Sequence, residues 1–123
     1  MNFENNVQRL FVKPEDKTLR LVHAAMGISG EAGEVVDAVK KHWIYGAPLD
    51  KENLLEECGD VLFYVSACLS LCGFSINDAM NHNIEKLNKR YPAGYSDNDA
   101  RKRADKAEVF PIVNVAPKSR GEE

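Results

Sequence analysis

Two pairs of acidic residues are the part of this sequence best suited to chemistry. Glu31 and Glu34 form one pair, Glu57 and Asp60 form the other, and two residues separate the acids in each pair. Residues three positions apart lie about 60° from each other around a helix, so each pair would project from one side of a helix. Two such helices packed face to face would bring four carboxylates together, and four negative groups stay close only when a cation neutralises them. Hard oxygen ligands of this kind are typical of Mg²⁺ or Mn²⁺ sites.

Each acidic pair alone is a weak motif, because solvated helix faces carry such pairs constantly. Here both pairs border an apolar stripe, and each contains a glycine, Gly33 or Gly59, which a solvated helix face does not favour. The residues alone leave both interpretations open, a divalent metal site and a solvated acidic face. A metal site of four carboxylates would suit phosphoryl or nucleotidyl chemistry, since such ions are commonly shared with substrate phosphates.

Candidate substrate contacts lie on two other segments. Lys86, Lys89 and Arg90 follow Asn83 by one to two helical turns and could reach phosphates, while Trp43 could stack on a base. The plainer interpretations are a solvated helix end for the cations and a core position for the aromatic ring. The three histidines share no ligand spacing, and no Ser/His/Asp or Cys/His set can be assembled from the sequence.

Helices must position these residues, because helix formers dominate and alternating strand patterns are few. We predict four main helices, over residues 2–12, 17–45, 51–72 and 76–90, and a short charged helix near 97–106. Apolar residues recur at steps of three and four from Leu21 to Trp43 and from Leu54 to Cys72, which is the pattern of a bundle seam. On the fourth helix, Met80 and Ile84 are expected to face inward. The predicted fold is therefore an all-α helical bundle.

Local signals mark where these helices begin and end. Asp50 and Ser75 are plausible N-caps, with Asp78 three residues after Ser75, and Gly46 is a plausible C-cap. Three glycines at positions 27, 30 and 33 each cost a helix roughly 0.5–1 kcal/mol relative to alanine. Either another helix or a ligand approaches closely there, or the helix breaks near residues 29–30.

Composition bounds the class of protein. The chain has 123 residues, a net charge of −3, 44% hydrophobic and 28% charged residues, which favours one soluble domain and gives no sign of a nucleic acid polymer as partner. A bundle this small buries a modest core, so self-association is expected. The apolar stretch at 61–74 is shorter than the roughly 20 residues of a membrane span, and residues 1–11 lack a secretory pattern. We expect a cytoplasmic protein without membrane contact, with three reduced core cysteines, a domain at 1–108 and an extended arm at 109–123.

Residues 30–35 (GEAGEV) and 56–61 (EECGDV) fit the signature Glu-x-x-Glu, spacer, Glu-x-x-Asp. Residues 83–86 (NIEK) fit a downstream Asn-x-x-Lys element, and 90–96 (RYPAGYS) looks like the segment that follows it. In this order and spacing, the sequence resembles the MazG-like nucleoside triphosphate pyrophosphohydrolases of the all-α NTP pyrophosphatase superfamily, over roughly residues 19–103.

The resemblance implies a helical bundle that assembles as a homodimer or homotetramer. It implies Mg²⁺, or Mn²⁺ in its place, held by Glu31, Glu34, Glu57 and Asp60, with Glu34 and Glu57 as catalytic carboxylates and Glu34 orienting the attacking water. The reaction implied is hydrolysis of a nucleoside triphosphate to the monophosphate and pyrophosphate. The resemblance extends to Asn83, Lys86 and Arg90 as candidate substrate contacts, and Trp43 is added to them as the base-stacking candidate named above. Glu56 adds a fifth acid, either in a supporting position or in solvent.

Two alternatives stand beside this hypothesis. One is a pyrophosphatase for dUTP, dCTP or phosphoribosyl-ATP, since enzymes of this superfamily with those substrates share the same pattern of acidic residues. A helical oligomer that binds metal or nucleotide without turnover is the alternative from another class.

Overall fold

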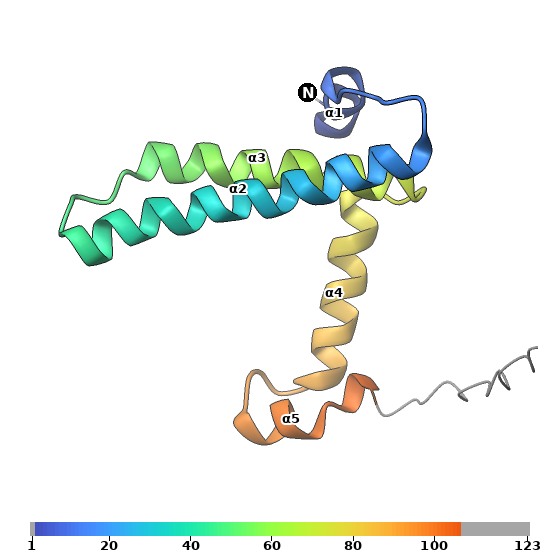
Figure 1. Cartoon of the computed structure of the whole chain (residues 1–123). Helices are drawn as coiled ribbons and strands as arrows, with labels where there is room; N and C mark the ends of the chain where they lie inside the picture. Colours follow the sequence, from blue (N-terminus) through green and yellow to red (C-terminus); the bar gives the residue numbers. More distant parts are fainter. Residues whose placement is uncertain (1, 107–123) are drawn as a thin grey trace, which may run out of the picture. The chain divides into compact units, whose positions relative to one another are not determined.

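The computed structural model describes residues 2–106 of the chain (Figure 1). The helices are α1 (Phe3–Leu10), α2 (Lys17–Tyr45), α3 (Lys51–Leu71), α4 (Ile76–Arg90) and α5 (Asp97–Lys102), followed by a 3₁₀ turn at Ala104–Lys106. No strand forms within these residues, so the predicted all-α class is confirmed. The chain divides after Met80, within α4, into two compact units that are described separately below.

Local capping explains why the helix bounds fall so close to those predicted from sequence. The Asp50 side chain accepts a 3.0 Å hydrogen bond from the backbone N–H of Asn53, and Gly46 ends α2 with φ of 66°. Ser75 and Asp78 cap each other, because the N–H of Asp78 donates to Ser75 Oγ at 3.0 Å and the N–H of Ser75 donates to Asp78 Oδ2 at 2.8 Å. The caps predicted at these positions are confirmed.

Helix α2 runs without a break through Ser29 and Gly30, so the alternative of two helices is wrong. Close approach explains one of its glycines. A Cβ added at Gly27 would lie 2.2 Å from the Tyr64 ring of α3, whereas one added at Gly30 or Gly33 would meet no atom within 4 Å. The glycine at position 27 therefore lets α3 pack directly against the backbone of α2.

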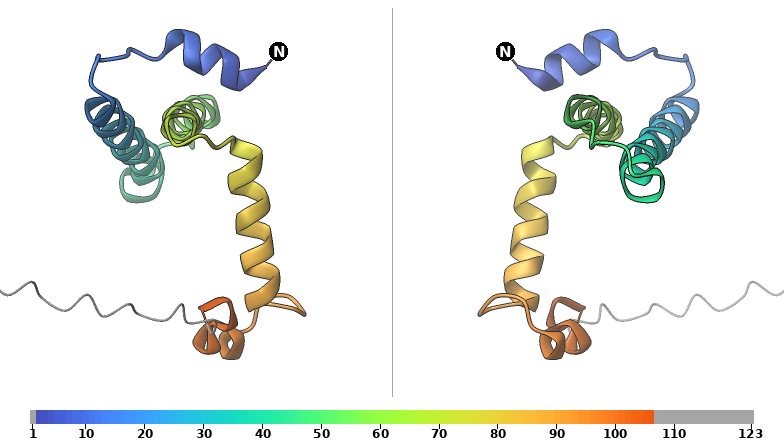
Figure 2. Two further views of the ribbon diagram at one scale, coloured as in Figure 1. Left: turned by 90° about the vertical axis from the view of Figure 1, so that its right-hand side faces the viewer. Right: turned by 90° about the vertical axis from the view of Figure 1, so that its left-hand side faces the viewer.

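Unit 1 is an antiparallel hairpin of α2 and α3 with α1 packed against α3 (Figures 1 and 2). Ala24 of α2 and Ala67 of α3 are buried with Val7 and Phe11 at the α1 end of the hairpin. Glu4 Oε1 also accepts a 2.7 Å hydrogen bond from the N–H of Ile76, which ties α1 to the start of α4. Partly buried hydrophobic residues that pack against this core are Phe63, Tyr64, Cys68 and Leu71.

Several residues predicted to lie in the core are instead exposed. Trp43 is 81% exposed, so the interpretation of it as a core residue is wrong. Cys58 and Cys72 are exposed free thiols, so the prediction that they are core residues is also wrong. Met80 and Ile84 are also more than half exposed, contrary to the inward face expected of α4. The apolar periodicity identified which residues share a side of each helix, but no described part of the chain covers the exposed residues named here.

Unit 2 holds the end of α4, a turn at residues 91–95, and α5. Ser96 Oγ accepts from the N–H of Asp99 at the start of α5, and Arg103, with φ of 48°, ends the helix before the 3₁₀ turn. The charged helix predicted near 97–106 is therefore shorter than expected. Arg90 and Asp105 form a two-point ion pair, with Nε to Oδ1 at 2.6 Å and the second guanidinium nitrogen to Oδ2 at 2.7 Å. The predicted arm at 109–123 and the boundary before it lie outside the described residues.

Within residues 2–106, no single helix has the length and apolarity needed to cross a membrane. The bent pair of α3 and α4 passes that test by length and composition alone.

Candidate metal centre

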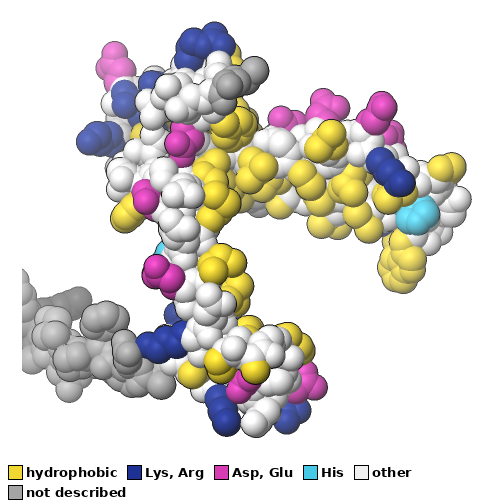
Figure 3. Space-filling model, turned by 180° about the vertical axis from the view of Figure 1, so that it is seen from behind, with side chains coloured by type: hydrophobic (Ala, Val, Ile, Leu, Met, Phe, Trp, Pro, Cys, Tyr) yellow, Lys and Arg dark blue, Asp and Glu magenta, His cyan; other side chains and the backbone are white. Residues whose placement is uncertain are grey.

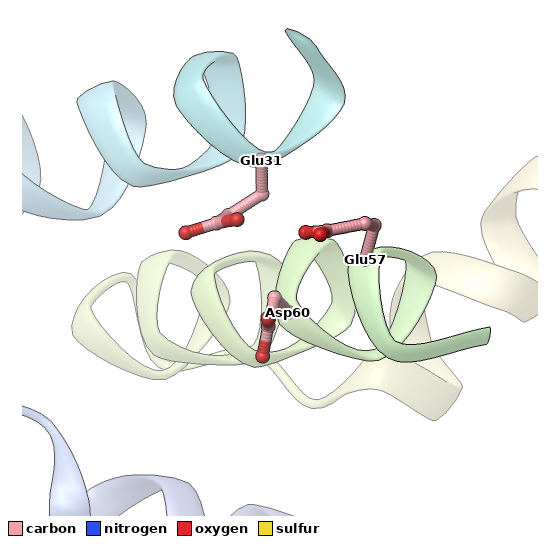
Figure 4. A group of neighbouring side chains, drawn as sticks. All are labelled: Glu31, Glu57 and Asp60. Atoms are coloured by element: carbon pink, nitrogen blue, oxygen red, sulfur yellow. The ribbon is translucent and has the colours of Figure 1, made fainter. Parts of the chain in front are cut away.

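Three of the four predicted acids meet between α2 and α3. Glu31 of α2 and Glu57 and Asp60 of α3 each offer one carboxylate oxygen, and these oxygens lie within 4.8 Å of one another (Figure 4). Glu31 and Glu57 are half-buried, while Asp60 is exposed. The hairpin therefore gathers the acids from both signature pairs at one place.

The position of Glu31 follows from the register of α2. Ala24 and Ala38 are the buried residues of this helix, and Glu31 lies seven residues from each of them. Seven residues are close to two turns, so all three share the face that packs on α3. Small alanines on either side let the two helices approach, and a carboxylate between them is held against the opposite helix.

Glu34 lies outside the three-residue group and is exposed. It stands one turn further along α2 and about 60° around the helix from Glu31. The charge of its carboxylate nevertheless affects the pKa of Glu57 in the group of three. Desolvation first, and then repulsion from Glu34 and Glu31, raises the pKa of the Glu57 carboxyl above its ordinary value.

Glu56 is exposed and also lies outside the group of three. Its charge, with that of Asp60, contributes a smaller part of the rise in the pKa of Glu57. On α3, Glu56 lies about 40° around the helix from Asp60. The charges of both acids and of Glu34 on α2 act on the Glu57 carboxyl, so these acids line the same edge of the hairpin. We call this edge, formed by Glu34, Asp37, Lys41, Glu56 and Asp60, the acidic flank.

The donor set fits a hard divalent cation. Mg²⁺ binds oxygens at about 2.0–2.1 Å, so two ligands on opposite sides of the ion lie about 4.2 Å apart. A spread of up to 4.8 Å between the three carboxylate oxygens needs only small side-chain rotations to reach that value. The mutual repulsion that raises the pKa of Glu57 is also the repulsion that a bound cation would relieve.

Trp43, a predicted base-stacking residue, lies on the opposite side of α2. It is nine residues after Glu34, which places it about 180° around the helix. It lines a shallow apolar groove with Val36 and Ile44, and a second groove adjoins the first through Val35. We call this surface the apolar flank; its residues are Ala32, Val35, Val36, Val39, Trp43 and Ile44 of α2, with Cys58, Val61 and Leu62 of α3.

Figure 3 shows hydrophobic side chains gathered over the α2–α3 hairpin, with acidic side chains along one edge. The two flanks therefore divide the hairpin surface into a charged edge and an apolar side.

The predicted contacts on α4 belong to unit 2, whereas the acids belong to unit 1. Asn83, Lys86 and Arg90 lie within about 60° of one another around the helix, so they share one of its sides. Asn83 is exposed and Lys86 is half-buried. Arg90 is held by Asp105, whose carboxylate, with only 2% of its side chain exposed, occupies two guanidinium donors. The pairing keeps the pKa of Asp105 at about 2, because the Arg90 hydrogen bonds favour its ionised form.

Sequence reasoning missed two charged partners. Lys41 pairs with Asp37 at 2.8 Å on the acidic flank, and Asp105 pairs with Arg90. Helical spacing could have found the first pair, since Lys41 lies four residues after Asp37 on the same helix. Nothing local could have found the second, because the pair joins the end of α4 to a 3₁₀ turn fifteen residues later.

Comparison with known proteins gives one match. A family model for the MazG nucleotide pyrophosphohydrolase domain matches residues 22–95, which is more than half of the chain and includes all four signature acids. No curated protein and no solved structure matches the chain.

Proposed function

This chain belongs to the MazG nucleotide pyrophosphohydrolase family, and from that premise we propose that it hydrolyses nucleoside triphosphates to the monophosphate and pyrophosphate with a divalent metal ion. The observation that carries the proposal is the meeting of Glu31, Glu57 and Asp60 between α2 and α3. Three carboxylates gathered on one side of a hairpin are costly without a cation, and the family to which the chain belongs acts on nucleotides.

The proposed ligands are Glu31, Glu57 and Asp60, with Glu34 moving in from the adjacent turn. Mg²⁺, or Mn²⁺ in its place, would supply positive charge that binds phosphate oxygens and offsets the charge developing on them. The residues themselves do the remaining tasks. Glu31 and Glu57 approach from opposite helices, which fixes the position of the centre between them.

Glu34 is proposed to orient the attacking water because its exposed carboxylate lies one turn from Glu31 and can accept a hydrogen bond from that water. In the reaction, the water oxygen bonds to the α-phosphorus and the bond from that phosphorus to the oxygen bridging to the β-phosphate breaks. Pyrophosphate leaves with the electron pair of that bond, and the proton of the water passes to a carboxylate such as Glu34.

We propose the substrate contacts from the sequence prediction. Asn83 and Lys86 offer an amide and an ammonium from one side of α4, which suit a sugar or phosphate group. Arg90 would have to exchange Asp105 for a phosphate, and Trp43 would have to stack on a base from the apolar flank.

The product assay tests the reaction class directly. Purified protein is incubated with each NTP and dNTP plus Mg²⁺, and we expect monophosphate and pyrophosphate in equal amounts. Orthophosphate and diphosphate would show that another bond is cut. Tight metal-dependent nucleotide binding without products would favour the non-catalytic binding protein, and preference for dUTP, dCTP or phosphoribosyl-ATP would favour those relatives within the superfamily.

Metal removal gives an independent check. A ligand of the folded state at 100 times its Kd stabilises it by about 2.7 kcal/mol, so protein with saturating Mg²⁺ should melt at a higher temperature than protein in EDTA. Activity should disappear in EDTA and return with added Mg²⁺. If EDTA changes neither the melting temperature nor the activity, the assignment of these acids as metal ligands is wrong.

We also propose that the working form is a homo-oligomer. Val7 is the only large side chain that is fully buried in the part of the chain that the structure describes. A core this small offsets little of the conformational entropy lost on folding, while the apolar flank leaves large side chains in water. A second copy on that flank would bury both faces and turn two hairpins into a four-helix bundle.

A further inference from the structure

The acidic flank carries one lysine beside its acids. Lys41 lies seven residues after Glu34 on α2, which places it about 20° around the helix from Glu34 and about 10.5 Å further along. Its ammonium pairs with Asp37 Oδ2 at 2.8 Å, and 62% of its side chain is exposed. The side chain is therefore held on the flank and remains open to a ligand.

Lys41 also lies in the electrostatic field of the metal centre. The Asp37 hydrogen bond first, and then the charges of Asp37, Glu34 and Glu57, raise the pKa of the Lys41 ammonium. It therefore stays protonated at neutral pH. A cation that senses Glu34 on its own helix and Glu57 on the facing helix stands beside the centre that both helices form.

The neighbouring Lys40 provides a contrast within the same turn. It pairs with the same Asp37, at 3.6 Å, but lies about 120° around the helix from Glu34 and lines the apolar groove with Trp43. Both ammonium groups therefore reach Asp37, but Lys40 starts from the side of α2 that lines the apolar groove, whereas Lys41 starts from the side that carries Glu34. An explanation by the helix dipole alone would apply to both of them equally.

We propose that Lys41 is a phosphate-binding residue of this site, contacting the phosphate chain of the bound nucleotide in exchange for its ion pair with Asp37. The inference rests on the proposed function, because it needs a polyphosphate held at the acids. A triphosphate carries more negative charge than one divalent ion neutralises, so a protein cation on the same flank adds favourable interaction. Asp37 serves as the resting partner that holds the ammonium in place before the substrate binds.

The test compares wild type with Lys41→Ala, Lys41→Arg and the matched control Lys40→Ala. For each protein, kcat and KM are measured with Mg²⁺ and a triphosphate that wild type hydrolyses, and the Kd of a nonhydrolysable triphosphate with Mg²⁺ is measured by calorimetry. We expect Lys41→Ala to raise KM and Kd roughly tenfold, which corresponds to about 1.4 kcal/mol. Lys41→Arg keeps the charge and should remain within roughly threefold of wild type, and Lys40→Ala should stay close to wild type.

Two results would overturn the inference while the proposed function stands. One is a Lys41→Ala enzyme with unchanged KM and Kd, and the other is an equal loss in Lys40→Ala. Measuring the affinity for Mg²⁺ without nucleotide distinguishes a phosphate contact from a role in which Lys41 only offsets the charge of the acids. If Lys41 only offsets repulsion among the acids, its removal tightens Mg²⁺ binding and leaves the affinity for nucleotide unchanged or improved. Lys41→Met, which keeps the length of the side chain, carries the comparison if the alanine variant folds poorly by circular dichroism.

Failure of the proposed function looks different. Wild type that binds the Mg²⁺ triphosphate without hydrolysing it refutes the reaction, and a weaker Kd in Lys41→Ala would still support the phosphate contact. Wild type that neither hydrolyses nor binds any triphosphate refutes both.

Discussion

Glu57 stands at the point where α3 faces the middle of α2. Its half-buried carboxyl shares the centre with Glu31 and Asp60, and burial together with these neighbours raises its pKa. A side chain in this position does little for packing and much for the charge of the centre. Its substitution should therefore separate function from stability.

Glu57→Gln keeps the size of the side chain and removes its charge. We expect kcat/KM for triphosphate hydrolysis to fall by more than about 100-fold, since even residues that only support metal ligands change activity by 10–100-fold. The metal-free variant should melt no lower than wild type, because the substitution relieves repulsion among the acids. Glu52→Gln, in the exposed first turn of the same helix, is the control and should keep wild-type activity. A Glu57→Gln enzyme with full activity would remove the residue from the centre.

The raised pKa of Glu57 also predicts a pH dependence. Between its ordinary value of 4.5 and its raised value in the folded protein, the folded state holds a proton that the unfolded chain has lost. The contribution of Glu57 to the free energy of unfolding therefore falls as pH rises through this window, in metal-free protein. Saturating Mg²⁺ should reverse the trend, because metal binding needs the ionised carboxylate.

Thermal melts across a pH series from 4.5 to neutrality check this prediction. Wild type in EDTA should lose more stability with rising pH than Glu57→Gln does under the same conditions. Parallel curves for the two proteins would mean that Glu57 titrates normally.

At the scale of the elements, the bounds of the helices could be predicted because caps are local. Asp50 and Ser75 bond to backbone groups three residues away, and Gly46 needs only its own φ to end a helix. Helical phase places Glu31 on one side of α2 with Ala24 and Ala38, but the sequence prediction put Glu31 at the border of the apolar stripe and did not identify this side as the one that packs on α3. These local rules place the two acidic pairs on neighbouring helices, but they do not show that Glu34 stays outside the group of three.

What covers each apolar face could not be predicted from periodicity. The pattern along α2 and α3 identifies which residues share a side, but not whether that side meets another helix of the same chain. Trp43 and Cys58 therefore appeared to be core residues and are exposed on the apolar flank. The pair of Arg90 and Asp105 was equally hidden, because it depends on where a turn brings residues that lie fifteen positions apart.

The contact of Gly27 with Tyr64 is a test of how the hairpin is held together. Gly27→Ala would place a Cβ 2.2 Å from the tyrosine ring, so the ring or the helices must shift, and we expect a loss of roughly 1–3 kcal/mol in the free energy of unfolding. Gly30→Ala is the matched control in the same helix, with no atom within 4 Å of the new Cβ. It should gain roughly 0.5–1 kcal/mol from helix propensity. Urea denaturation gives the free energy of unfolding of each variant. Equal changes in Gly27→Ala and Gly30→Ala would contradict the close approach of Tyr64 to Gly27.

At the scale of the whole molecule, the small core and the apolar flank have to be explained together. Val36 is 64% exposed and Leu62 50% exposed, yet both lie on long, regular helices with no described segment over them. Such a face on an otherwise charged chain is typical of a protein–protein interface. The acidic flank lies on the other edge of the hairpin, so a partner copy on the apolar flank would leave the acids open to substrate. The same copy would cover the groove that Trp43 lines, so this assembly and base stacking by Trp43 from the same groove are alternatives.

Leu62→Glu tests this assembly, because it places a charge in the groove formed with Val35 and Cys58. Sedimentation velocity should give a mass of two or four chains for wild type and a smaller species for the variant. The melting temperature of the wild type should also rise with protein concentration, since an obligate oligomer is stabilised by mass action. Leu10→Glu, on α1 and 55% exposed, is the matched control and should leave the mass unchanged. A wild type that sediments as a single chain at every concentration would show that the apolar flank stays uncovered, and the stability of so small a core would then need another source.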